Sequence, residues 1–198
     1  MKKADEDKCG SMKTYIALFR GINVGGKNRL PMKDLRTLLA DLGAQSVQTY
    51  IQSVNAVFRH ETENAPQLSN SIAAAIKQSH GFDPRVLLLD LGEMDQAIAS
   101  NPYPEGETEP KSLHLYFLAS VPQNPDLETL DSIKQDDERF KLIDQVLYLH
   151  APAGIGRSKL AARVEQALGV AVTARNWRTV CEIMAMARQG ADSVNPLS

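Results

Sequence analysis

Hydrophobic and polar residues alternate along the first half of this chain in two periods, one typical of strands and one typical of helices. Residues 14–19 are apolar on both faces, which predicts a central strand of a sheet. A helical stripe follows over residues 31–43, then a pair of strands within 47–58, a second helix over 64–81 and a strand at 86–89. The predicted order is strand, helix, strand, strand, helix, strand, which is the order of a ferredoxin-like unit.

The second half repeats this order without any repeat of the residues themselves. After a short helical stretch at 93–99, the pattern predicts a strand at 113–118, a helix at 126–133, paired strands at 140–143 and 146–149, a helix at 158–169 and a short strand at 170–172. A further helix begins after Asn176. The sequence therefore predicts an α+β protein with two tandem ferredoxin-like (βαββαβ) subdomains and an added C-terminal helix.

A proline-rich, acidic stretch at 101–110 separates the two halves and is predicted to be a linker. We expect the first ferredoxin-like subdomain at 14–100, and the second, together with the added helix, at 111–190. Residues 1–13 are highly charged and lack the apolar core of a signal peptide, so they are predicted to be a disordered extension. Residues 191–198 are predicted to be a tail.

Composition narrows the functional classes. The net charge of −2 provides no broad field for long stretches of nucleic-acid backbone, so any anion site must be local. The two cysteines, Cys9 and Cys181, are far apart, which argues against a disulfide framework and a zinc site and favours the cytoplasm. The four histidines form no metal-like cluster, and no run approaches the ~20 apolar residues of a membrane span, so we expect no metal, cofactor or membrane partner.

A glycine-rich loop between the first strand and the first helix carries the clearest candidate chemistry. Gly25 and Gly26 permit close backbone approach, and Arg20, Lys27 and Arg29 place cations near the unpaired amides of a helix start. The loop therefore predicts an anion site, although glycines that only let the chain turn would produce the same pattern.

Two later segments repeat this chemistry. Arg157 and Lys159 follow two glycines at the start of a predicted helix, and Arg175 precedes the asparagine that caps the last helix. Three independent helix caps would explain these residues structurally. The functional hypothesis is one cleft shared by the two subdomains, with this set of ligand-binding residues: Arg20, Gly25, Gly26, Lys27, Arg29, Arg157, Lys159 and Arg175.

Three functions fit these loops, and the sequence leaves open whether the protein is an enzyme. The leading hypothesis is a small anionic ligand, bearing phosphate or carboxylate, bound in the shared cleft. The alternative is a nucleic-acid-binding module that uses the same basic loops. A nucleotide-hydrolysing P-loop is less favoured, because Pro31 would fall inside its helix and Asn28 replaces the hydroxyl residue that binds magnesium.

Several uncommon motifs in the same order resemble the domain-of-unknown-function family numbered 1697. These motifs are Phe19–Gly26, Pro31-Met32, Thr49–Ser53 and Arg175–Val180. The resemblance covers about residues 13–188, and it implies two ferredoxin-like subdomains and no established activity. One position departs from the family pattern: Val54 stands where the family has glycine, so the geometry of that turn is expected to differ.

The last predicted helix carries an apolar stripe. Trp177, Val180, Cys181 and Met184 follow the i, i+3, i+4, i+7 spacing of one helix face. We therefore expect both Trp177 and Cys181 to be largely buried.

Overall fold

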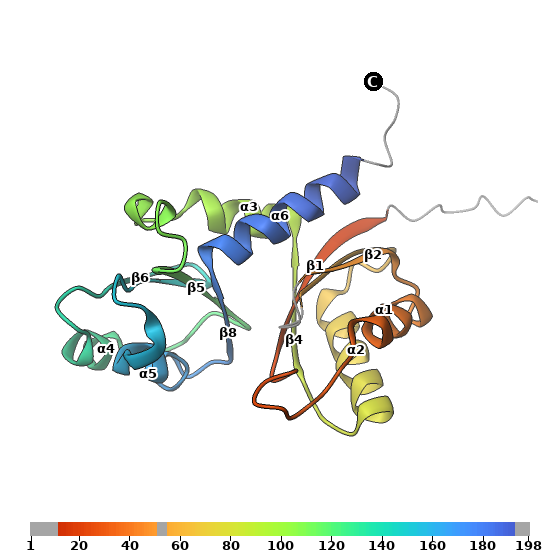
Figure 1. Ribbon diagram of the computed structural model, residues 1–198, viewed down its shortest axis with the longest axis horizontal. Helices are drawn as coiled ribbons and strands as arrows, with labels where there is room; N and C mark the ends of the chain where they lie inside the picture. The colour runs from red at the N-terminus through yellow and green to blue at the C-terminus, as the bar shows by residue number, and fades with distance from the viewer. Residues whose placement is uncertain (1–11, 51–54, 193–198) are drawn as a thin grey trace, which may run out of the picture. The chain divides into compact units, whose positions relative to one another are not determined.

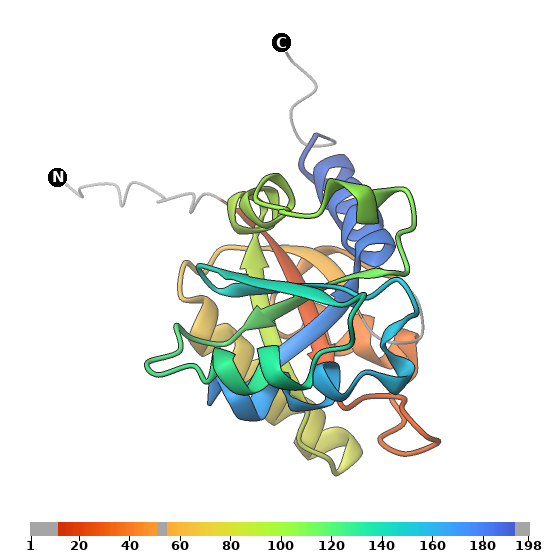
Figure 2. The same ribbon diagram turned by 90° about the vertical axis from the view of Figure 1, so that its left-hand side faces the viewer.

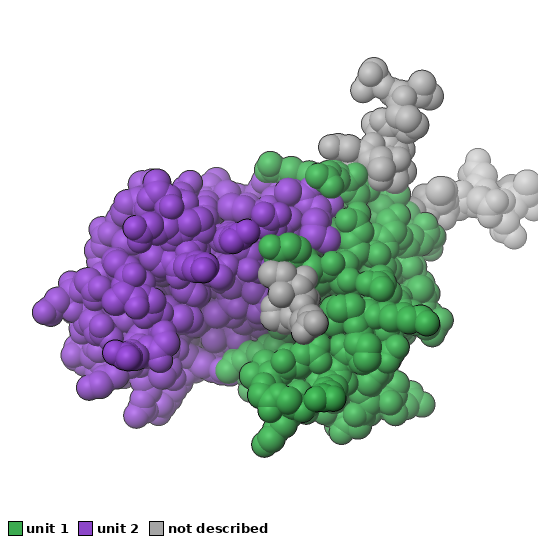
Figure 3. Space-filling model, viewed as in Figure 1, with its two compact units in different colours: residues 1–90, 187–198 green, residues 91–186 purple. Residues whose placement is uncertain are grey.

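The computed structural model describes residues 12–50 and 55–192. Over these residues it has eight β-strands in two four-stranded sheets, together with six α-helices, and every named strand pair is antiparallel. The α+β class predicted from the sequence is confirmed. The chain forms two compact units, which Figure 3 colours separately: unit 1 comprises residues 1–90 and 187–198, and unit 2 comprises residues 91–186.

Unit 1 contains one sheet with the strand order β2-β3-β1-β4. Its elements are β1 (Lys13–Arg20), α1 (Met32–Asp41), β2 (Gln45–Tyr50), β3 (Asn55–His60), α2 (Ala65–His80) and β4 (Arg85–Asp90). Because β1 pairs with β3 on one side and β4 on the other, the predicted central strand is confirmed. Figure 1 shows α1 and α2 together on one side of this sheet.

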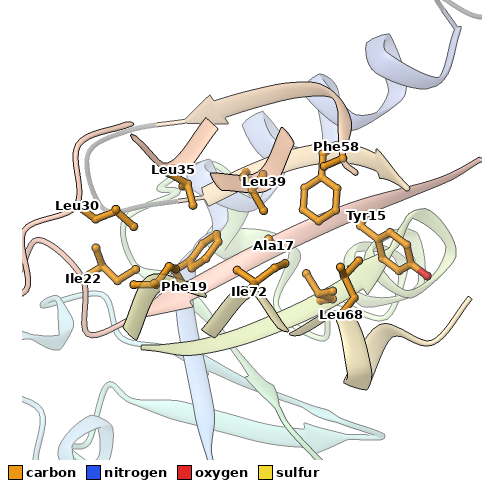
Figure 4. Close-up of a cluster of buried hydrophobic side chains, with 14 residues drawn as sticks. Tyr15, Ala17, Phe19, Ile22, Leu30, Leu35, Leu39, Phe58, Leu68 and Ile72 are labelled. Carbon is orange, nitrogen blue, oxygen red and sulfur yellow. The ribbon is translucent and has the colours of Figure 1, made fainter. Parts of the chain in front are cut away.

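The core of unit 1 lies between the sheet and these two helices. Figure 4 shows alternate side chains of β1 meeting one stripe from each helix. The labelled members from these three elements are Tyr15, Ala17, Phe19, Leu35, Leu39, Leu68 and Ile72. The intervening residues Ile16 and Leu18 are also fully buried, which explains why both faces of β1 are apolar.

Unit 2 contains the second sheet, with the strand order β6-β7-β5-β8. Its elements are α3 (Leu91–Ala99), the 3₁₀ helix η1 (Pro104–Glu107), β5 (Leu113–Leu118), α4 (Leu127–Ile133), β6 (Arg139–Ile143), β7 (Val146–His150), the 3₁₀ helix η2 (Ile155–Arg157), α5 (Lys159–Leu168), β8 (Val172–Asn176) and the first part of α6 (Trp177–Asp192). Figures 1 and 2 show α4 and α5 side by side along this sheet, where they cover its second apolar core.

Two sequence predictions for the end of the chain need correction. The last strand is Val172–Asn176 and not 170–172, so Arg175 lies within a strand. Trp177 is buried, with 6% of its surface exposed, as predicted, but Cys181 is exposed. The prediction for the turn at Val54 falls outside the described residues. Of the extension predicted at 1–13, residues 1–11 also fall outside them, whereas Lys13 belongs to β1.

Residues 101–110, predicted to be a linker, lie in unit 2 and pack on its sheet. The ring of Tyr103 stacks on that of His150, with 5.9 Å between the centroids, and the Arg139 guanidinium lies 5.1 Å from the centre of the Tyr103 ring. Arg139 also forms an ion pair with Glu105 and donates a hydrogen bond of 3.0 Å to Nδ1 of His150. This segment is therefore held by aromatic, ionic and hydrogen-bonding contacts.

Gly106 packs against Leu113 and His150 of the sheet, and its replacement is expected to be destabilising. A Cβ at Gly106 would lie 2.9 Å from Cβ of Leu113 and 3.0 Å from Cδ2 of His150. Gly106→Ala should therefore lower the free energy of unfolding by about 1–3 kcal/mol in urea denaturation. Gly156→Ala is the control, because nothing lies within 4 Å of the added carbon; equal stability of the two variants would contradict the prediction.

Candidate functional site

The loop between β1 and α1 forms a small β-hairpin. The backbone N–H of Lys27 donates to the carbonyl of Val24 at 3.1 Å, and these two residues form an isolated antiparallel bridge. Between them, Gly25 and Gly26 both have positive φ, at 59° and 75°. Positive φ at both central residues is the requirement of a type I′ turn, so the turn itself accounts for the two glycines.

Two asparagines close the base of this hairpin. Asn23 Oδ1 accepts from the N–H of Leu30 and its Nδ2 donates to the carbonyl of Leu30, both at 2.9 Å. Asn28 Nδ2 donates to the carbonyl of Gly21 at 2.7 Å. Ile22 and Leu30 are almost fully buried, and Figure 4 shows them at one end of the core cluster. The hairpin is thus attached to the core at both of its ends.

This geometry argues against the nucleotide-hydrolase alternative. In a P-loop the helix begins at the lysine, so that the glycine-rich backbone and the helix amides meet at one phosphate. Here Lys27 belongs to the hairpin, whereas α1 begins at Met32 after Pro31. The neighbouring strands β3 and β4 are both antiparallel to β1, unlike the strands of a parallel nucleotide-binding sheet.

The predicted cations of the first loop are all exposed. Arg20 is the last residue of β1 and lies opposite Arg85 in the register with β4. Lys27 and Arg29 lie on the exposed part of the hairpin. These side chains lie at the surface of unit 1.

The second glycine loop, in unit 2, forms the short helix η2 and leads into α5. Ser158 is buried, and its Oγ accepts from the N–H of Ala161 at 2.9 Å, so Ser158 caps α5 at the predicted helix start. Arg157 and Lys159, on either side of this cap, are exposed. The cap is structural, and the two cations are the part of this loop that remains free to meet a ligand.

The third segment joins β8 directly to α6. Asn176 Oδ1 accepts from the N–H of Thr179 at 2.9 Å, which confirms the predicted cap. Arg175 is a half-buried strand residue opposite Leu115, and its Nη1 donates to the carbonyl of Ala174 at 2.8 Å. Desolvation by burial lowers the pKa of the Arg175 guanidinium to about 10.

A pocket of about 590 Å³ in unit 2 lies where two of these segments meet. The described residues that line it come from the stretch before β5, the stretch after β7 and the first turn of α6: Glu109, Pro110, Lys111, Ser112, Pro152, Ala153, Gly154 and Arg178. It therefore includes the start of the second glycine loop and an arginine of the α6 start. Its volume is within the range of small-ligand sites.

Short hydrogen bonds fix the walls of this pocket. The N–H and the Oγ of Ser112 both donate to the carbonyl of Glu109 at 2.8 Å. The carbonyl of Ser112 accepts from the N–H of Ala151 at 2.8 Å, and the carbonyl of Ala151 accepts from the N–H of Gly154 at the same distance. The two turns that form the walls are thus connected to each other.

Comparison with known proteins identifies the family. The family model described as "Protein of unknown function (DUF1697)" matches residues 12–148, which is more than half of the chain. The chain belongs to this family.

A solved structure shows the same fold as this DUF1697 protein. It is described as the structure of conserved bacterial protein SP0830 from Streptococcus pneumoniae. The match has a TM-score of 0.68 and 23% sequence identity, and it covers 89% of this chain and 99% of that one. No curated protein matches the chain.

The predicted binding set of this DUF1697 protein is divided between its two units. Unit 1 holds the five first-loop residues, and unit 2 holds Arg157, Lys159 and Arg175. The shared cleft is not a feature of either unit and stays a prediction. Within unit 2, the second and third segments do meet at the pocket, but through Gly154 and Arg178.

Lys111, Ser112 and Arg178 of the pocket were not among the binding residues predicted from the sequence. Lys111 follows the proline-rich acidic stretch that resembles a linker, so its charge carried no functional signal. The one available signal for Arg178 was its position after the capping residue Asn176, at the positive end of a long helix.

Buried polar groups elsewhere in unit 2 do not form a metal site. Nδ1 of His114 and Oε1 of Glu138 are buried and have no hydrogen-bond partner within the described part of the chain. Desolvation lowers the pKa of His114, which favours its neutral form. Burial and, secondarily, the Glu138 carboxylate raise the pKa of Tyr116 to about 12. Across residues 12–50 and 55–192, no group of three potential ligands could hold a metal ion.

None of the described helices is both long and apolar enough to cross a membrane.

Proposed function

We propose that this DUF1697 protein binds a small ligand carrying a phosphate or carboxylate group in the pocket of unit 2. The observation that supports it is the presence of two cations, Lys111 and Arg178, on the lining of one pocket. Arg178 lies in the first turn of α6, where the unpaired amides and the helix dipole also favour an anion. Arginine can hold a carboxylate or phosphate with two parallel hydrogen bonds.

The remaining lining residues restrict the kind of ligand. Pro110, Pro152 and Ala153 offer an apolar surface for the body of a small molecule. The carboxylate of Glu109 leaves the lining side chains with a formal charge of only +1, which favours one anionic group over a polyphosphate. We therefore favour a small organic acid or a monophosphate.

Simple energetics indicate a modest affinity. A charge-assisted hydrogen bond contributes about 1.5–3 kcal/mol, and a helix N-terminus adds about 0.3–1 kcal/mol. Two cations and one helix start would thus supply roughly 3–7 kcal/mol, equivalent to a Kd between about 4 mM and 10 μM. A screen must therefore use millimolar ligand.

We also infer that each unit is a ferredoxin-like subdomain. The order βαββαβ with an antiparallel sheet arranged 2-3-1-4 supports this assignment for unit 1. Unit 2 has the equivalent order β6-β7-β5-β8, with α4 and α5 in the two helix positions. On this basis the pocket lies at the end of the second sheet where β5 begins and β8 ends, next to α6.

The binding proposal predicts a selective effect of two substitutions. In a thermal-shift screen of sugar monophosphates, nucleoside monophosphates and carboxylates, a ligand should raise the Tm of the natural protein, because it binds the native state alone. Lys111→Ala and Arg178→Ala should each weaken its binding about tenfold or more in titration calorimetry, through the loss of a charge-assisted hydrogen bond. Arg163→Ala, which removes an exposed cation of α5 outside the pocket lining, should leave the affinity unchanged.

The same titration separates this pocket from the cleft predicted to be shared by both units. If Lys27→Ala and Arg29→Ala weaken the ligand while Lys111→Ala does not, the site lies at the first loop and the pocket proposal is wrong. A ligand whose affinity is insensitive to both Lys111→Ala and Arg178→Ala would also overturn it.

A further inference from the structure

We propose that the hairpin between β1 and α1 is a docking surface for double-stranded nucleic acid, which it would hold by the phosphodiester backbone. The surface consists of the hairpin, residues 22–30, together with Arg20 before it and Lys33 after it. It lies in unit 1 and shares no residue with the proposed ligand pocket of unit 2. The inference is therefore independent of the proposed function.

The first argument is local charge. No Asp or Glu occurs between Met12 and Lys33, although the whole protein has a net charge of −2. Lys13, at the far end of β1, is neutralised by Asp90 at 2.8 Å. At the hairpin end, Arg20, Lys27, Arg29 and Lys33 are all exposed, and Asp34 is the first acidic residue after them. An electropositive patch of this kind complements a row of phosphates.

The second argument is that the hairpin is already ordered. Its tip is a two-residue type I′ turn, its base is closed by the paired hydrogen bonds between Asn23 and Leu30, and Leu30 is 1% exposed. Ordering a flexible loop would cost binding free energy, and here that cost is absent. The positions of Lys27 and Arg29 along the backbone are therefore set before a partner arrives.

The third argument is shape. A two-stranded β-ribbon is narrow enough for the major groove of B-form DNA, and Gly25 and Gly26 leave its tip without bulky side chains. No atom lies within 4 Å of the position that a Cβ would occupy at either glycine. Backbone amides at such a tip can approach phosphate oxygens closely, as glycine-rich turns do in other anion sites.

The nature of the exposed side chains selects a duplex over other partners. The hairpin surface, Arg20 and residues 22–30 with Lys33, carries no aromatic residue, so it offers no platform for stacking unpaired bases. Val24, at the hairpin tip, and Val121 are the large exposed apolar residues within residues 12–50 and 55–192. A lone valine is too little for the apolar centre of a protein interface or for insertion into a lipid surface.

Fluorescence anisotropy with the full chain tests this inference. A labelled duplex of about 20 base pairs, as DNA and as RNA, is titrated between about 20 and 200 mM salt, because log K should fall linearly with log salt. Two to four phosphate contacts predict a slope of about −2 to −4. Lys27→Ala and Arg29→Ala should each make that slope shallower by about 1 and weaken binding at every salt concentration. Arg163→Ala, an equal change of charge on α5, should leave the salt slope and the affinity unchanged.

Four outcomes would overturn the inference. The first two are the absence of binding to either duplex at about 20 mM salt, and a loss of duplex affinity in the Arg163→Ala variant as large as that in the hairpin variants. The third is tighter binding to single-stranded than to double-stranded oligonucleotides. The fourth is binding to anionic vesicles that depends on Lys27 while duplex binding does not. A duplex affinity that depends on Lys27 and Arg29 but not on Arg163 would support it, and the preferred duplex would identify DNA or RNA.

Discussion

Trp177→Ala is expected to lower the free energy of unfolding by about 3–5 kcal/mol, the cost of removing a large buried aromatic side chain and leaving a cavity. Trp177 is 6% exposed and begins the buried stripe of α6, which continues through Val180 and Met184. Urea denaturation followed by far-UV circular dichroism is the suitable measurement. Tryptophan fluorescence would be lost in this variant, since Trp177 is the single tryptophan of the chain.

Cys181→Ala is the matched control on the same helix. Cys181 is exposed, so its truncation should change the free energy of unfolding by less than about 0.5 kcal/mol. If Trp177→Ala lowers the free energy of unfolding by less than about 1 kcal/mol, this result would contradict the burial of the Trp177 side chain in solution. It would indicate instead that the indole is accessible for stacking on a ligand.

The secondary structure could be predicted because its local signals agree with one another. The apolar run of β1 predicted a central strand, and its place between β3 and β4 confirms this. Helix starts were equally clear, since Asn64, Ser158 and Asn176 each accept a hydrogen bond from the backbone three residues later. A side-chain cap is a local interaction, so it can be recognised without knowledge of the tertiary fold.

Predictions failed where the apolar pattern was weak or where a residue lay at its edge. Cys181 fits the i+4 spacing from Trp177, but the buried stripe is centred on Val180, Ile183 and Ala187, which leaves Cys181 on the exposed margin. β8 extends to Asn176 although its later residues are polar. Its place is set by hydrogen bonds to β5, which are long-range contacts that a local pattern does not contain.

The candidate site could likewise be predicted only in part, because it depends on long-range contacts. Glycine loops were visible in the sequence, but the pocket of unit 2 combines the start of β5, the end of β7 and the first turn of α6. Only the pairing of β5 with both β7 and β8 brings these segments together. The hairpin, in contrast, is a local structure, and the sequence missed it because its two glycines suggested a phosphate loop as readily as a type I′ turn.

Asn23→Ala is expected to lower the free energy of unfolding by about 3–7 kcal/mol, because two unsatisfied backbone groups and an unfavourable φ combine at one residue. The substitution removes both hydrogen bonds to Leu30, and it leaves the N–H and C=O of this residue, which is 1% exposed, without those partners. Each unsatisfied buried group costs about 1–3 kcal/mol. Alanine must also adopt the φ of 54° that asparagine tolerates, at a further cost of about 1 kcal/mol.

Asn23→Asp separates these contributions. Aspartate keeps the acceptor for the Leu30 N–H and tolerates the left-handed backbone, but it loses the donor to the Leu30 carbonyl, so its destabilisation should be about half that of alanine. Urea denaturation of both variants measures this order, and an alanine variant as stable as the natural protein would show that the hairpin is not closed by Asn23. Because Asn23→Ala leaves the charge of the hairpin unchanged, it also tests whether duplex binding requires an ordered ribbon: affinity should fall along with stability, whereas full affinity in this variant would assign the binding to charge alone.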